Sequence, residues 1–272
     1  MNMIKLNLIE GTVINRPSLK IKSPYMADIL LENNQEYLAH SPSLGLGGLI
    51  LNGTIVMLSL KKGNRKSNYT IELVSVCDKE LNNKQIWIGS NPLNANKIFS
   101  ECISNNYLNE FKKYIVEKAE VKILNSRLDF LLSNIKNEKC YVEVKNVPLV
   151  DYNPNLHDDN KKLLFGSTKN YKRAAIFPAG YKKSKLDCIS SRAYKHLEDL
   201  IELKKQNIRV CLVFILQRED PLIFKPNYIG DIKYSNKLKE AYDYGVEIYA
   251  YKFKWTHLEC NFMCKVPIIF ES

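Results

Sequence analysis

The stretch "RLDFLLSNIKNEKCYVEVKNV", residues 127–147, places three charged side chains inside two apolar segments. The apolar segments predict two strands, and the Asn- and Lys-rich "SNIKNEK" between them predicts a hairpin turn. Because side chains alternate across a strand, Glu143 and Lys145 share one face of the second strand, and Asp129 points away from its apolar neighbours on the first. If the two strands pair, the three charged groups converge on one side of the sheet.

Two carboxylates buried side by side are unfavourable, because desolvation and mutual repulsion both oppose their ionisation. A divalent cation removes that penalty, and Mg²⁺ or Mn²⁺ held by Asp129 and Glu143 would accept a substrate phosphate and several waters as further ligands. Lys145 would then orient or deprotonate the attacking water, or stabilise charge developing on phosphorus. The alternative is that Glu143 and Lys145 form an exposed ion pair on an edge strand.

Length and composition limit the class of protein. The chain has 272 residues, of which 45% are hydrophobic, so it is long enough for one large domain or two smaller ones. No apolar run approaches the roughly 18 residues of a membrane span, and the N-terminus interleaves polar residues, so we expect a soluble cytoplasmic protein with no membrane partner. Seven scattered cysteines, several within apolar runs such as "RVCLVFIL", predict reduced, buried thiols.

The net charge of +11 is concentrated in one part of the chain. Residues 161–195 contain ten basic residues and one acid, interleaved with aromatic residues. Such a segment attracts a phosphate backbone and offers rings for base stacking, so we expect DNA as a partner, with RNA as a further candidate. The alternative for this segment is a solvated lysine-rich loop. The residues expected to bind nucleic acid here are Lys172, Arg173, Lys182, Lys183 and Lys185.

A smaller basic loop lies in the first part of the chain, just before Tyr69. Its candidate nucleic-acid-binding residues are Lys61, Lys62, Arg65 and Lys66. This loop offers an edge for contact with a nucleic-acid backbone, although a solubilising hairpin is the more frequent meaning of such residues.

Residues 1–88 are expected to form an all-β domain. Five segments alternate apolar and polar residues and are separated by turn signals: "EGTVINR", "YMADILLEN", "QEYLAHS", "TIVMLSLK" and "NYTIELVSV". Five short strands in this length predict a small closed barrel, with an OB-like barrel as the version that commonly binds nucleic acid. An SH3-like barrel fits the spacing nearly as well.

Residues 89–272 are expected to form an α/β domain, with the boundary near residues 88–96. Helical spacing predicts a helix over residues 97–118 that is broken at the Asn pair 105–106. After the hairpin come a helix capped by serines, the buried strand "RVCLVFIL", a helix from Ser235 to Gly245, and the strand "VEIYAYKF". This alternation predicts a mixed sheet flanked by helices.

An Asp on one strand followed by Glu-x-Lys on the next resembles the PD-(D/E)xK nuclease core. Further blocks resemble the sugar fermentation stimulation protein A family along nearly the whole chain: "YLAHSPSLG", "NRKSNYTIELV", "NPLNANKI", "EVKILNSRLDFLL", "CYVEVKNVPL", "FP", "RAYKHLEDL" and "GVEIYAYK". The resemblance implies an OB-like domain joined to a nuclease-type α/β domain with a restriction-endonuclease-like mixed sheet. It also implies DNA binding, DNA or RNA nuclease activity, and a role in regulating sugar utilisation genes.

By this resemblance, particular residues take family positions. Asp129, Glu143 and Lys145 match the nuclease positions, Glu120 matches the acidic residue ahead of "SRLDF" and is a further candidate metal ligand, and Arg127 matches the arginine of that strand.

The chain departs from the family pattern in several places. The Asp expected after "FP" is Ala179, and the Thr-Glu-Arg-Gly start of the next helix is replaced by residues 190–193, "SSRA". Arg192, Lys195 and His196 remain on one helical side and are expected to face phosphate near the metal. The "AHSPSLG" loop lacks the usual Cys and Asn, and the longer segment before this helix carries much of the basic patch.

The residues "HLECNFMC" contain a second candidate metal group. His257, Cys260 and Cys264 have ligand types that suit zinc, but no fourth ligand is evident and a core strand explains them better. The leading function is therefore a nuclease dependent on Mg²⁺ or Mn²⁺. Its rival is a non-catalytic DNA-binding regulator of sugar utilisation genes that keeps the nuclease core as scaffold, and a structural interaction module is a third reading.

Overall fold

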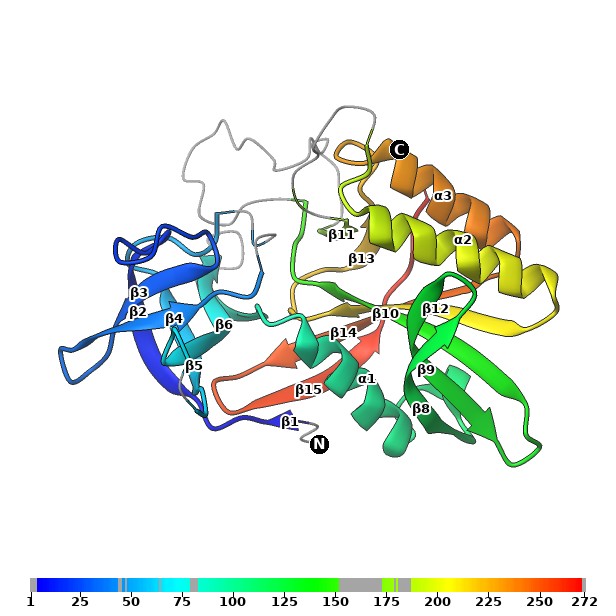
Figure 1. Cartoon of the computed structure of the whole chain (residues 1–272), viewed down its shortest axis with the longest axis horizontal. Coiled ribbons are helices and arrows are strands. Elements are labelled where there is room, and N and C mark those ends of the chain that lie inside the picture. The colour runs from blue at the N-terminus through cyan, green and yellow to red at the C-terminus, as the bar shows by residue number, and fades with distance from the viewer. Residues whose placement is uncertain are drawn as a thin grey trace.

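The computed structural model describes residues 4–43, 46, 48–63, 65–78, 83–151, 173–178, 180 and 187–270. Its N-terminal part contains a five-stranded barrel (Figure 1). The barrel strands are β2 (Ile9–Asn15), β3 (Met26–Leu30), β4 (Glu36–His40), β5 (Ile55–Leu60) and β6 (Tyr69–Asp78). They follow the order β4-β3-β2-β5-β6, and a parallel pairing of β4 with β6 closes the ring. The predicted all-β barrel ahead of an α/β region is thus confirmed.

Alternating side chains fill the barrel, as a half-buried strand pattern requires. Val13, Ile29, Val56 and Ile71 are fully buried in its core. The sheet then continues beyond the barrel through β7 (Lys84–Gly89), which pairs with β6 and meets β14 where Trp87 faces Trp255.

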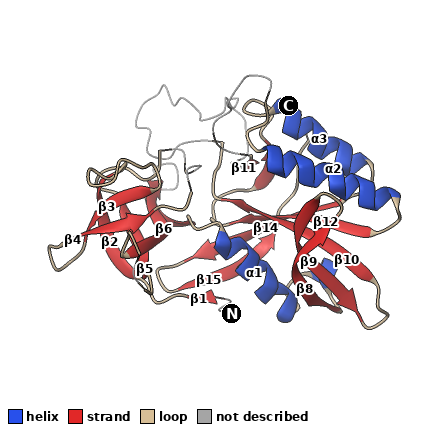
Figure 2. Cartoon of the chain, in the orientation of Figure 1, coloured by secondary structure: helices blue, strands red, loops and turns tan. Residues whose placement is uncertain are grey.

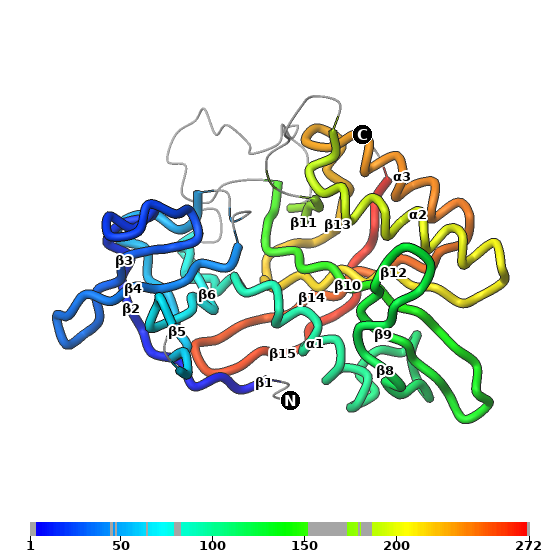
Figure 3. Tube along the Cα trace, in the orientation of Figure 1, coloured from blue at the N-terminus to red at the C-terminus, as the bar shows by residue number. Residues whose placement is uncertain are grey.

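The second part is a mixed sheet with helices on both faces (Figure 2). Its strands are β8 (Tyr114–Ile123), β9 (Ser126–Asn134), β10 (Lys139–Val147), β12 (Arg209–Leu216), β14 (Glu247–Trp255) and β15 (Glu259–Lys265). β10, β12 and β14 run parallel, whereas β8 and β9 are antiparallel to their neighbours. β1 (Ile4–Lys5) pairs with β15, so the N-terminal end lies beside this sheet (Figure 3).

The helices divide between the two faces of this sheet. α1 (Leu93–Ser104) packs on one face, where Val142 and Val213 belong to the same core as its residue Phe99. α2 (Ser191–Lys205) and α3 (Ile232–Asp243) cover the other face. A separate pair of short parallel strands, β11 (Ala174–Phe177) and β13 (Ile223–Pro226), lies near the start of α2. Within the described residues no helix is both long and apolar enough to span a membrane.

The predicted hairpin of residues 127–147 is confirmed. β9 and β10 pair antiparallel from Ser133 with Lys139 to Phe130 with Val142. On its other side β10 pairs in parallel with the buried strand β12, with Glu143 opposite Leu212. The charged residues of β10 therefore lie near the centre of the sheet and not on an edge strand.

Two local predictions are wrong. The helix expected over residues 97–118 ends at Ser104, a 3₁₀ turn covers Asn109–Phe111, and the rest forms β8. Hydrogen bonding of β8 to the whole length of β9 outweighs the local helix propensity of "YIVEKAEV", and Ile115, which suggested a helix face, is 67% exposed.

The start of the second predicted helix also differs. Asp231 caps α3, because its carboxylate accepts a hydrogen bond from Tyr234 N at 3.1 Å. Ser235, the predicted cap, lies inside the helix and donates its hydroxyl proton to Asp231 O at 2.9 Å. The carboxylate of Asp231 also accepts from Ile189 N at 2.6 Å, which joins the starts of α2 and α3.

Replacing leucines by alanine tests whether β12 lies in the hydrophobic core. We expect Leu212→Ala on β12, which is 1% exposed, to lower the free energy of unfolding by about 2–5 kcal/mol. Leu60→Ala at the end of β5, which is 70% exposed, is the matched control and should change it by less than about 0.5 kcal/mol. Urea denaturation measures both, and equal effects at the two sites would contradict the placement of β12 in the core.

Candidate functional site

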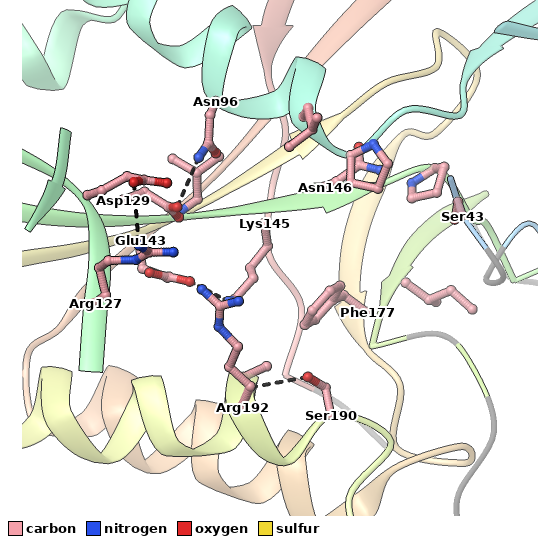
Figure 4. A pocket seen from close by; sticks show the side chains of 17 residues that line it. Ser43, Asn96, Arg127, Asp129, Glu143, Lys145, Asn146, Phe177, Ser190 and Arg192 are labelled. Carbon is pink, nitrogen blue, oxygen red and sulfur yellow. Dashed lines mark hydrogen bonds and ion pairs between the residues drawn. The ribbon is translucent and has the colours of Figure 1, made fainter. Parts of the chain in front are cut away.

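A cavity of about 520 Å³ lies between the start of α1, strands β9 and β10, and the first turn of α2. Its wall includes the charged residues Glu120, Arg127, Asp129, Glu143, Lys145 and Arg192. Figure 4 shows Asp129 and Glu143 on the strands and Arg192 reaching toward them from α2. The structure thus brings the three residues of the Asp and Glu-x-Lys pattern to one cavity.

Asp129 is fixed where β9 and β10 separate. Their pairing ends at Phe130 and Val142, and beyond it Val144 N donates to Asp129 Oδ2 at 2.8 Å. Asn96 of α1 donates its amide to Asp129 Oδ1 at 2.9 Å. The carboxylate therefore takes the place of a strand partner and ties α1, β9 and β10 together at the cavity.

Glu143 is a buried carboxylate with a concentrated set of partners. Its side chain is 3% exposed, and its Oε1 lies 2.5 Å from Lys145 Nζ and 2.5 Å from His196 Nδ1. Its second oxygen, Oε2, is buried and has no hydrogen-bond partner among the described residues. Lys145 and His196 thus hold one oxygen of Glu143 and leave the other unpaired.

His196 joins the first turns of α2 to this carboxylate. Its ring is buried, and Arg192 Nε lies 3.5 Å from its Nε2. With a proton on Nδ1 the ring can donate to Glu143 Oε1 and accept from Arg192 Nε, and Lys145 Nζ lies 3.4 Å from the same Nδ1. The ring therefore lies between the carboxylate of Glu143 and the guanidinium of Arg192.

The pKa values of the two carboxyl groups are shifted in opposite directions. Burial, followed by the charge of Glu143, raises the pKa of Asp129 above its ordinary value despite the hydrogen bonds from Val144 and Asn96. Burial also opposes ionisation of Glu143, but the charge of Lys145 and the hydrogen bond from His196 outweigh it, so its pKa is lowered. Asp129 is therefore the carboxylate at which burial and the charge of Glu143 outweigh the positive charge of Lys145.

The oxygen donors fit a hard divalent cation in kind. Glu143 Oε2 has no hydrogen-bond partner among the described residues, and a positive charge beside Asp129 would oppose the repulsion by Glu143 that adds to burial in raising its pKa. Across the described ranges no cluster of three or more His, Cys, Asp or Glu side chains is arranged to hold a metal. Water and substrate phosphate would have to complete the coordination of Mg²⁺ or Mn²⁺, as is common for Mg²⁺.

Glu120 is more exposed than Asp129 and Glu143, and the candidate zinc ligands do not line their cavity. Glu120 lines the cavity, but its side chain is 67% exposed and forms an ion pair with Arg127 at 3.5 Å, so its role as a ligand stays a prediction. Cys260 of β15 is buried in the core, whereas Cys264, four residues along the same strand, is exposed. His257 precedes that strand.

The predicted nucleic-acid-binding residues have several different environments. Arg127 and Arg192 line the cavity and Lys195 does not, and all three side chains are exposed, whereas His196 is buried. Arg173 forms a largely buried ion pair with Asp78 at 2.6 Å, which gives it a role within the fold. Four further predicted residues are exposed or half-buried: Lys61, Lys62, Arg65 and Lys66. The other four lie outside the described residues, as does Ala179: Lys172, Lys182, Lys183 and Lys185.

Two residues at the site were not expected from the sequence. Asn96 holds Asp129, and Asn146, next to Lys145, lines the cavity and accepts a hydrogen bond from Gln217 Nε2 at 2.6 Å. Asn96 lies within the block "NPLNANKI" that resembles the family, so this block could have indicated Asn96 as a candidate site residue. The contact itself joins residues 33 positions apart and has no local signature.

Comparison with known proteins places the chain in a family. Residues 93–159 and 168–259 match the family model of the sugar fermentation stimulation protein RE domain, SfsA. A sugar fermentation stimulation protein homolog of Shewanella denitrificans is 30% identical over 97% of this chain and 98% of its own length. A homolog of Methanosphaera stadtmanae is 31% identical over 95% of this chain and 92% of its own length.

A solved structure is similar along the whole fold. The structure of Pyrococcus furiosus SfsA in complex with Ca²⁺ covers 99% of each chain, with a TM-score of 0.77 and 21% identity. At that identity the likeness supports the shared fold. The family model and the curated relatives carry the assignment further, and on their evidence this chain belongs to the sugar fermentation stimulation protein family.

Proposed function

We propose that this chain binds nucleic acid and hydrolyses phosphodiester bonds with the help of Mg²⁺ or Mn²⁺. The observation that carries the proposal is the arrangement of Glu143, which is held through one oxygen by Lys145 and His196 and keeps the other oxygen buried and unpaired beside Asp129. DNA is the first candidate substrate and RNA the second.

The comparisons support a cation at this fold without assigning one to this chain. The solved Pyrococcus furiosus protein is described in complex with Ca²⁺, a hard cation that prefers oxygen ligands. In this chain the carboxylates of Asp129 and Glu143 are the oxygen donors that line the cavity from the neighbouring strands β9 and β10. A bound Mg²⁺ or Mn²⁺ would polarise the scissile phosphate and lower the pKa of a water molecule.

The residues of the chain supply positioning and positive charge. The Lys145 ammonium is kept in place by Glu143 and lines the cavity, where it can stabilise negative charge that develops on the phosphate oxygens. Arg192 approaches from the opposite side and can pair with the same group. Hydrolysis would add the hydroxyl of water to phosphorus and leave a proton on the departing oxygen.

One observation favours the rival function, a DNA-binding regulator of sugar utilisation genes that keeps the site as scaffold. Glu143 is already neutralised by Lys145 and hydrogen-bonded by His196, so the buried charge does not need a cation for its stability. Such a protein would bind DNA in a salt-dependent manner in EDTA and would leave it intact with Mg²⁺ or Mn²⁺.

Cleavage assays separate the two functions. We expect the wild type to cleave single-stranded or duplex DNA or RNA with Mg²⁺ or Mn²⁺ and to lose cleavage in EDTA. Asp129→Ala should reduce the rate by at least about 100-fold, because it removes a ligand and the group that fixes Val144 and Asn96. Lys145→Gln should reduce it by a similar factor through loss of positive charge in the cavity.

The control for this assay is Asp243→Ala, which removes an exposed carboxylate paired with Lys239 on α3 and should cleave as the wild type does. If Asp129→Ala and the wild type cleaved equally, the proposal that this site is a nuclease centre would be removed. Binding without cleavage in every condition would support the regulator.

Cation binding should also appear in the stability of the protein. At 100 times its dissociation constant, Mg²⁺ should stabilise the wild type by about 2.7 kcal/mol, measured as an upward shift of the thermal midpoint. Asp129→Asn should lose most of this shift, whereas Asp243→Asn should keep it. An equal shift in all three proteins would place the cation elsewhere.

The same measurement has a defined pH dependence. The pKa of Asp129 is raised in the folded state, so without a cation its ionisation costs stability as pH rises through the range between the unfolded and folded pKa values. Mg²⁺ opposes that cost, and its stabilising effect should fade as pH falls through the raised pKa, because protons then compete for the carboxylate. A Mg²⁺ effect that grew on acidification would contradict this assignment.

A further inference from the structure

A second cavity of about 450 Å³ lies beside the first, between the turn that joins β8 to β9 and the first two turns of α2. Arg127 and Arg192 line both cavities, so the two spaces adjoin across these side chains. The first cavity contains the carboxylates, whereas the second is lined by Ser126, Lys195 and His196 and has no acidic residue among its lining residues.

The second cavity carries an excess of positive charge. Within the described part of the chain neither Arg192 nor Lys195 forms an ion pair, and both are exposed. Arg127 does have a partner in Glu120 at 3.5 Å, but both side chains are more than half exposed, and such surface pairs contribute little. Three basic groups therefore face a space that lacks a fixed anion.

Neutral hydrogen-bond donors lie at the same place. The hydroxyl oxygen of Ser126 is buried and has no partner in the described structure, and Ser126 itself is 8% exposed. On the other wall α2 begins, where Ser190 accepts from Ala193 N and leaves the backbone N–H groups of Ser191 and Arg192 without an intrahelical acceptor. A tetrahedral anion suits this mixture of charged and neutral donors.

We propose that the second cavity binds the phosphodiester group next to the scissile one, so that the two cavities hold successive phosphates of one strand. This inference rests on the proposed nuclease function. It identifies the neighbouring phosphodiester as the group through which the protein positions the substrate strand. Arg127 and Arg192, shared by both cavities, would lie between the two phosphates. Lys195 would contact only the neighbouring one, because it lines the second cavity and not the first.

Neutral backbone linkages provide the test. A single methylphosphonate, which lacks the negative charge, is placed at each position in turn of an oligonucleotide, and cleavage with Mg²⁺ or Mn²⁺ is mapped for each substrate. With the wild-type chain we expect a neutral linkage immediately to one side of the cut bond to reduce its cleavage by about tenfold or more, and a neutral linkage further away to have little effect.

The variant Lys195→Gln identifies the cavity responsible. It should cut the unmodified substrate more slowly, by a similar factor, and should lose its sensitivity to the neutral linkage at that one position. Lys205→Gln, at the other end of the same helix and paired with Glu202, is the control and should retain the wild-type pattern. Thermal midpoints of the two variants check that both remain folded, as expected for exposed side chains.

Three other outcomes would contradict the inference or the nuclease function. If neutral linkages on both sides of the cut bond had no effect on wild-type cleavage, the inference would be overturned while the nuclease function stood. If cleavage depended instead on a terminal phosphate of the oligonucleotide and the dependence vanished in Lys195→Gln, the cavity would take a phosphomonoester, and the internal phosphate would be excluded. If no substrate were cleaved at all, the nuclease function and this inference would both fall.

Discussion

The buried carboxylate of Glu143 constrains the arrangement of the whole second part of the molecule. It lies on β10, between β9 and β12, with its side chain 3% exposed. A carboxylate in such a position is unstable unless charge and hydrogen bonds compensate for its loss of water. Lys145, two residues along the same strand, supplies the charge, and His196 supplies a hydrogen bond from a different element.

The second of these partners fixes the position of α2. Ser190 caps the helix, the small side chain of Ala193 is buried, and His196 follows on the next turn. Arg192 lies four residues before His196, so the two occupy neighbouring positions on one face of the helix. The contact of His196 with Glu143 therefore also places Arg192 at the cavity.

The alternation of charged and apolar residues was sufficient to predict which side chains meet, because a strand has a strict period of two. It predicted the hairpin of β9 and β10 and the convergence of Asp129, Glu143 and Lys145 on one cavity. It could not predict that Asp129 would accept from Val144 N, because that contact depends on where the two strands separate.

Other features depended on distant parts of the chain. β8 has the local composition of a helix and becomes a strand only because β9 provides its hydrogen-bond partners. Asn96 contacts Asp129 because α1 packs across the sheet beside β9, and nothing in the local sequence indicates this packing. The cap of α3 was misplaced because Asp231 and Ser235 are both good capping residues, and the tertiary contact of Asp231 with Ile189 N favours the earlier one.

The barrel is connected to the wall of the cavity through one buried glutamine. Gln217 Nε2 donates to Asn146 Oδ1 at 2.6 Å, and Gln217 Oε1 accepts from Trp255 Nε1 at 3.0 Å. Its backbone carbonyl accepts from Gly89 N at 2.9 Å, at the end of the strand that leaves the barrel.

This contact leaves no room for a larger residue at position 89. A Cβ atom on Gly89 would lie 2.1 Å from Gln217 Oε1 and 2.7 Å from Trp255 Nε1, so a side chain there would displace the glutamine. Because Gln217 holds Asn146, and Asn146 adjoins Lys145 on β10, a displacement at the barrel strand would reach the charged wall of the cavity through two hydrogen-bonded residues. The close approach of β7 to Gln217 therefore makes the position of the barrel part of the geometry of the site.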